Sequence, residues 1–130
     1  MKVLWVALGL CLAASVMQAR GLEYQPRLDR DKLSQGATVL LDFRTDWCIA
    51  CARHASIIDT LKEQNPALRA AITYIVVDYD TYGESGMAEK RRVTQNGTLL
   101  LLRGSRELGR VEGAVMNDSA IKELLELSLD

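Results

Sequence analysis

Two cysteines separated by two residues are the most reactive feature of this sequence. Cys48 and Cys51 lie in the segment WCIAC, and a pair at this spacing can bind zinc, attach haem covalently or act as a redox dithiol. A closed zinc site needs four ligands, but the chain offers no second cysteine pair and a single histidine, His54. Haem attachment needs a histidine directly after the second cysteine, where Ala52 stands. We therefore interpret the pair as a redox dithiol.

The elements expected around the pair favour that chemistry. Residues 37–43 (ATVLLDF) form an apolar run typical of a buried strand, and residues 48–64 show the spacing of an amphipathic helix. Cys48 then begins this helix, where free amide hydrogens and the helix dipole stabilise a thiolate. Cys51 follows one turn later, so we expect it to be less exposed and to resolve a mixed disulfide formed at Cys48. The alternative is a structural disulfide, which would add little stability because its loop is so short.

Two titratable side chains flank the pair in the sequence. Asp42 stands in the apolar strand, where burial would raise the pKa of its carboxyl and allow it to take a proton from Cys51. The alternative for Asp42 is a solvent-facing position at the strand end. His54 lies one turn beyond Cys51, and we expect a polar residue on the helix surface. The alternative for His54 is a third ligand to a metal held by the cysteines.

The remaining pattern predicts an α/β fold with a single mixed sheet in the order β-α-β-α-β-β-α. Further strands are expected over residues 72–78, 98–102 and 107–112, with helices over 29–33 and 87–93, a loop over 79–86 and a terminal helix capped by residues 117–119. A helix between the first two strands implies that they run parallel, and the last two strands read as a hairpin. We assign residues 37–130 to one domain and leave residues 20–36 as an N-terminal segment of uncertain structure.

Length, charge and the N-terminal segment narrow the functional classes. The chain has 130 residues and a net charge of −1, which is typical of one globular domain and argues against nucleic acid as a partner. Residues 1–19 combine a basic start with an uncharged run from Val3 to Met17, which indicates a cleaved signal peptide. The alternative is an uncleaved membrane anchor. Cleavage would leave Cys48 and Cys51 as the two cysteines of a protein in an oxidising compartment.

The segments VLLDF, RTD, WCIAC, IVVD, GTLLLL and GRVEGA resemble the thioredoxin superfamily over about residues 37–128. This resemblance implies the thioredoxin fold and thiol–disulfide exchange in which the dithiol itself is the redox group, with no other cofactor. Together with the signal peptide, the chain is similar to periplasmic thioredoxin-like proteins of bacteria. Asp42 matches the buried acid of the family. Trp47 matches the motif tryptophan, which packs beside the dithiol and shapes the surface that meets a substrate.

One position departs from the family pattern. Thioredoxins normally carry a cis-proline before the third strand, facing the dithiol, and Gly97 stands in that place before Thr98. We expect a trans bond here, because a cis bond at a non-proline residue costs about 3 kcal/mol. In the family this loop pairs with the substrate backbone and shields the dithiol from metal ions. The resemblance thus makes Trp47, Gly97 and Thr98 the candidate substrate-binding residues, and the glycine opens a route for metal.

Three functional hypotheses follow. The first is a periplasmic thiol–disulfide oxidoreductase, monomeric and more suited to reducing protein disulfides, because Ile49-Ala50 between the cysteines resembles reducing family members fed by a membrane electron-transfer partner. The second is a copper-binding or metallochaperone module that uses Cys48, Cys51 and His54, since soft thiolates suit Cu(I). The third is an interaction domain without redox activity.

Overall fold

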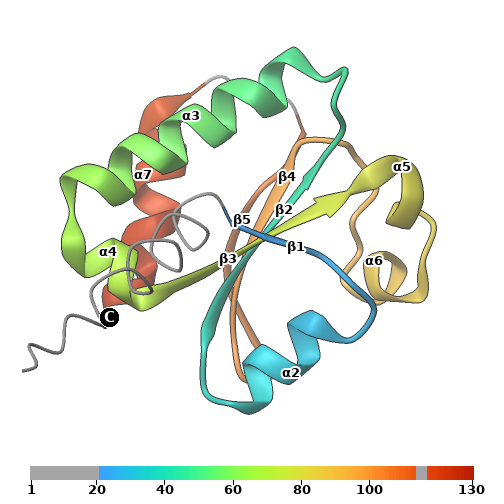
Figure 1. Ribbon diagram of the computed structural model, residues 1–130, viewed down its shortest axis with the longest axis horizontal. Coiled ribbons are helices and arrows are strands. Elements are labelled where there is room, and N and C mark those ends of the chain that lie inside the picture. Colours follow the sequence, from blue (N-terminus) through green and yellow to red (C-terminus); the bar gives the residue numbers. More distant parts are fainter. Residues whose placement is uncertain (1–20, 114–116) are drawn as a thin grey trace, which may run out of the picture.

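The protein is built on one five-stranded sheet, in the spatial order β1-β3-β2-β4-β5 (Figure 1). The computed structural model describes residues 21–113 and 117–130, so the expected signal peptide at 1–19 lies outside the described residues. Within those two ranges, no helix has the length and apolarity needed to cross a membrane. The strands are β1 (Leu22–Glu23), β2 (Thr38–Arg44), β3 (Ile72–Asp78), β4 (Thr98–Arg103) and β5 (Arg106–Val111). The helices are α2 (Leu28–Ser34), α3 (Ile49–Gln64), α4 (Pro66–Ala71), α5 (Tyr79–Tyr82), α6 (Gly86–Lys90), α7 (Asp118–Glu126) and the 3-10 helix η1 (Leu127–Leu129).

The strand directions confirm the predicted mixed sheet. β2 runs parallel to β3, and α3 forms the crossover between them. β4 is antiparallel to β2, and β5 returns antiparallel to β4 through a tight turn. Because β2 is the central strand, its C-terminal end and the chain that leads into α3 lie midway between the two outer strands.

Alternating side chains on β2 separate two hydrophobic cores. Val39, Leu41 and Phe43 pack with residues of α2, α5 and α6, whereas Leu40 packs with residues of α3, α4 and α7. Figure 1 shows these two helix groups on opposite faces of the sheet. Because side chains alternate along a strand, Asp42 shares the α3 face with Leu40.

Three short elements were not expected from the sequence. β1 pairs with β3 through only two residues, which is too short for a periodic pattern. α4 begins at Pro66 immediately after α3 ends, because proline suits the first position of a helix and the side chain of Asn65 caps it. α5 lies within residues 79–86, which we expected to be a loop. Since β1 and α2 both precede residue 37, the N-terminal segment is structured, and α2 packs against the same sheet.

The outer strand β5 carries a cluster of ion pairs centred on Arg110. Its guanidinium contacts Glu107 at 2.5 Å and Glu112 at 2.7 Å, and it donates to the backbone carbonyls of Arg91 and Arg92 after α6. These contacts join the sheet edge to the end of a helix. On the other side of the strand, Gly109 leaves room for α7, since a Cβ there would lie 2.9 Å from the Leu124 side chain.

Candidate active site

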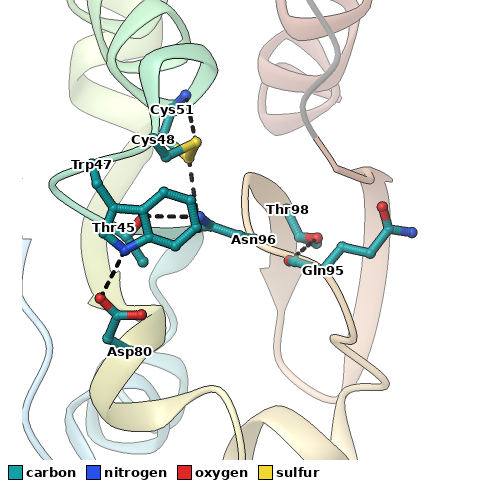
Figure 2. Close-up of a disulfide and its surroundings, with 8 residues drawn as sticks. All are labelled: Thr45, Trp47, Cys48, Cys51, Asp80, Gln95, Asn96 and Thr98. Atoms are coloured by element: carbon teal, nitrogen blue, oxygen red, sulfur yellow. Dashed lines mark hydrogen bonds between the residues drawn. A yellow bond between two sulfur atoms is a disulfide. The ribbon is translucent and has the colours of Figure 1, made fainter.

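The two cysteines form a disulfide at the start of α3. Cys48 is the N-cap residue, and its Sγ accepts a hydrogen bond from the backbone N–H of Cys51 at 3.1 Å (Figure 2). This confirms the expected position of the pair at a helix N-terminus. A thiolate formed at Cys48 would occupy the same acceptor position, where the helix dipole favours negative charge.

The cysteines differ in their access to solvent. Cys48 is half-buried, whereas Cys51 is 1% exposed. Two large apolar side chains beside Cys48 face solvent, with Trp47 69% and Ile49 84% exposed. The Trp47 indole donates from Nε1 to Asp80 at 3.0 Å, which orients the ring beside Cys48 (Figure 2). The tryptophan is therefore not a core residue, and the two side chains form an apolar rim around the more accessible sulfur.

Asp42 is completely buried beneath α3, as expected, and does not face solvent. The Tyr74 hydroxyl donates to its Oδ2 at 2.5 Å. Tyr74 reaches this oxygen from β3 because it pairs with Leu40, two residues before Asp42 on the adjacent strand. Burial raises the pKa of the Asp42 carboxyl, although the tyrosine hydrogen bond opposes part of that shift. Burial and the neighbouring carboxylate likewise raise the pKa of the Tyr74 phenol.

The position expected for His54 was wrong. This residue is 0% exposed and points into the protein instead of lying on the helix surface. It shares the inner face of α3 with Cys51 and Ile58, at spacings of three and four residues. Lys62 lies on the same face, 3% exposed, with its Nζ 5.2 Å from the centre of the Tyr74 ring. Burial lowers the pKa of this lysine.

The polar groups under α3 do not form a recognisable metal site. Among residues 21–113 and 117–130, no group of three or more His, Cys, Asp or Glu side chains is arranged to hold a metal ion. The copper alternative based on Cys48, Cys51 and His54 thus gains no support from the geometry.

The loop before β4 lies beside the disulfide. Gly97 has a φ of +84°, and within the described residues no peptide bond is cis, which confirms the expected trans geometry. Its N–H donates to the carbonyl of Phe43 at 2.8 Å, so the backbone bonds to the end of β2. Thr98 is 1% exposed and its hydroxyl donates to the carbonyl of Gln95. Substrate binding by Gly97 and Thr98 stays a prediction.

Sequence reasoning did not identify Asn96 as a site residue. Its Oδ1 lies 3.5 Å from Cys51 Sγ, and its Nδ2 donates to Thr45 Oγ1 at 2.8 Å. Figure 2 shows the Asn96 side chain reaching from the loop toward the cysteines, while Gln95 points the other way. The available signal was its place directly before Gly97, in the loop that the resemblance aligned opposite the dithiol.

Comparisons with known proteins agree with this geometry. The family model described as Thioredoxin matches residues 23–126. Thioredoxin-1 of Saccharomyces cerevisiae is 32% identical over 103 residues, which cover 79% of this chain and 87% of the relative. Thioredoxin of Echinococcus granulosus is 30% identical over 113 residues, covering 87% and 94% respectively. The crystal structure of Trxlp from Edwardsiella tarda covers 81% of this chain and 98% of that chain, with a TM-score of 0.69 and 28% identity. This chain belongs to the thioredoxin family of thiol–disulfide oxidoreductases.

Proposed function

We propose that the protein is a periplasmic reductase of protein disulfides, acting as a monomer and receiving electrons from a membrane partner. The observation that carries the exchange mechanism is the difference in exposure between the two cysteines. Cys48 is accessible within an apolar rim, whereas Cys51 is buried behind it. A substrate disulfide can reach the first sulfur and not the second.

The reaction then has two exchange steps. The Cys48 thiolate attacks one sulfur of the substrate disulfide, forms a mixed disulfide and releases the first substrate thiolate. The Cys51 thiolate attacks Cys48 Sγ, which releases the second substrate thiolate and leaves the Cys48–Cys51 disulfide. Two electrons have passed to the substrate. Asp42, buried on the α3 face with a raised pKa, serves as the base that takes the proton from Cys51.

The charges near Cys48 support the reducing direction. A strongly oxidising dithiol needs a highly stabilised thiolate in its reduced form. The two residues between the cysteines are uncharged. Arg53, two residues after Cys51, pairs with Asp118 of α7 at 3.0 Å, so its charge is shared with a carboxylate. The helix N-terminus then acts without an added positive charge between the cysteines, which suits a reductant.

The proposed compartment rests on residues 1–19, whose basic start and apolar run are typical of a signal peptide. Cytosolic reductases cannot reach a dithiol in the periplasm, so a membrane donor must reduce it again. Expression of the tagged full chain in a Gram-negative bacterium tests this location. We expect a shortened product in the periplasmic fraction that elutes as a monomer. A full-length product in the cytoplasm would refute the location.

The reduction potential tests the direction. We expect the purified protein, equilibrated against glutathione or dithiothreitol buffers, to give a value near the −270 mV of a typical thioredoxin. A value near −120 mV would instead assign the protein to disulfide formation. Absence of a reversible dithiol couple would refute the oxidoreductase mechanism itself.

A further inference from the structure

The Asn96 amide is anchored at one end and faces the disulfide with the other. Its nitrogen donates to the hydroxyl of Thr45, a residue only 5% exposed, in the chain between β2 and α3. Its oxygen is thereby directed at Cys51 Sγ, 3.5 Å away (Figure 2). An oxygen is an acceptor, so this end of the amide can bind a thiol hydrogen but cannot donate to a thiolate.

The disulfide leaves this acceptor without a hydrogen to bind. In the oxidised protein Cys51 Sγ carries no proton, and the approach of the two atoms is a contact between sulfur and oxygen. Reduction adds a hydrogen to Cys51 Sγ, within reach of the Asn96 oxygen. The amide oxygen is thus positioned for the reduced state, in which Cys51 first becomes a donor.

We propose that Asn96 is a positioning residue that accepts the S–H of Cys51 in the reduced protein and so keeps the proton on the resolving thiol until Cys48 has attacked a substrate. A hydrogen bond made by the neutral form of a group disfavours its ionised form. The negative charge of the dithiol therefore stays on Cys48, at the helix N-terminus. The inference rests on the dithiol exchange within the proposed function, and on neither its direction nor its compartment.

The sulfur of Cys51 can be titrated alone to test this. In a Cys11→Ser, Cys48→Ser background, the serine keeps an oxygen at the N-cap of α3, and the rate of alkylation against pH reports the remaining thiol. We expect Asn96→Ala to lower the pKa of Cys51, because the acceptor is gone. Asn96→Asp should raise it, because a carboxylate accepts more strongly and repels the thiolate. Gln95→Ala, whose side chain points away, is the matched control.

The resolving step gives an independent measurement in the Cys11→Ser protein. The reduced dithiol is mixed with one equivalent of 5,5′-dithiobis(2-nitrobenzoate), which forms a mixed disulfide at Cys48 and releases one thionitrobenzoate. Release of the second thionitrobenzoate then reports the attack of Cys51 on that mixed disulfide. If Asn96→Asp raises the pKa of Cys51 by two units, this release should slow about tenfold. If Asn96→Ala lowers that pKa by one unit, the release should become about threefold faster. Thr45→Val should resemble Asn96→Ala, because the amide loses its anchor.

The outcomes separate this inference from the proposed function. If both Asn96 variants leave the pKa of Cys51 unchanged, or shift it in the same direction, Asn96 only packs against the disulfide and the inference fails. The Cys11→Ser protein with its native Asn96, if it still releases two equivalents of thionitrobenzoate, would in that case retain its dithiol chemistry. If the Cys11→Ser protein never releases the second equivalent, the dithiol exchange fails first, and the inference falls with it.

Discussion

Two carboxylates are buried on opposite sides of the sheet, and they have different partners. Asp29 on α2 is 1% exposed and pairs with the guanidinium of Arg91, after α6, at 2.6 Å. Asp42 on β2 is 0% exposed and accepts a hydrogen bond from the neutral hydroxyl of Tyr74 at 2.5 Å. The first carboxylate is neutralised by a permanent cation. The second receives a hydrogen bond without a compensating full charge from that partner.

This difference separates a structural pair from a group suited to chemistry. Arginine stays protonated at every pH that a folded protein meets, so the charge of Asp29 is compensated throughout. A phenol with a raised pKa stays neutral, and burial then raises the pKa of Asp42. One buried carboxylate is thus paired with a fixed cation, whereas the other is suited to exchange a proton.

The largest effect is expected from removing the cation. Arg91→Met should lower the free energy of unfolding by about 3 kcal/mol, because it leaves Asp29 buried without its charge partner. Urea denaturation measures the change, and Lys90→Met, on the exposed side of the same helix end, is the control. A loss below about 1 kcal/mol would mean that Asp29 does not depend on the ion pair, and the contrast with Asp42 would collapse.

Removing the Asp42 carboxyl should slow substrate reduction and leave the fold intact. Asp42→Asn is expected to slow substrate reduction about 100-fold at pH 7, since the base for Cys51 is lost while an acceptor for the Tyr74 hydroxyl remains. Single-turnover reduction of insulin by the reduced protein gives the rate. Asp29→Asn serves as the matched variant and should leave the rate of the folded protein unchanged. Equal rates for wild type and Asp42→Asn would remove Asp42 from the mechanism.

Stability should depend on pH through Asp42. Its folded-state pKa is raised, so the native protein binds the proton more tightly than the unfolded chain does, and stability falls as pH rises from the ordinary carboxyl pKa through the folded-state value. Asp42→Asn lacks this loss. The free energy of unfolding of Asp42→Asn should therefore rise relative to that of wild type across this pH range and then level off. The total gain should be about 1.4 kcal/mol for each unit by which folding raises the pKa of Asp42. Denaturation from pH 4 to 9 measures it, and a pH-independent difference would contradict the assignment.

The smallest effect is expected at the hydrogen bond itself. The hydrogen bond from the Tyr74 hydroxyl lowers the pKa of Asp42, so Tyr74→Phe should raise that pKa. The pH-rate profile for insulin reduction should then move to higher pH. The stability cost is about 1 kcal/mol, typical of one hydrogen bond. Tyr24→Phe, in the core on the opposite face, should leave the profile in place. Identical shifts in both variants would show that the effect is not specific to Asp42.

The sequence predicted those parts of the fold and site that follow from local pattern. The apolar run before WCIAC and the helical spacing after it located β2, α3 and the Cys48 N-cap within a residue. An aspartate inside an apolar strand was enough to expect burial. The short β1 was not predictable, since its two residues are held by pairing with β3, far along the chain.

Contacts across long sequence separations account for what was missed at the site. His54 and Lys62 are polar, and residue type alone places such side chains in solvent. In the fold both are buried residues of α3, and Lys62 lies over the Tyr74 ring. Asn96 meets Cys51 across 45 positions of sequence. No local pattern in the sequence predicts such a contact, because it arises only when the fold brings the loop before β4 beside the start of α3.

The ion pairs around Arg110 have a consequence for how the protein meets unfolded chains. A sheet edge displays unpaired backbone groups, and an extended segment of another chain can add to it as a new strand. Here one edge strand, β1, has only two residues, and the other, β5, is lined by the Arg110 guanidinium with Glu107 and Glu112. Adding a strand at β5 would require displacing or burying these charges. Partly unfolded substrates can thus present their disulfides at α3 while the sheet edges resist their incorporation.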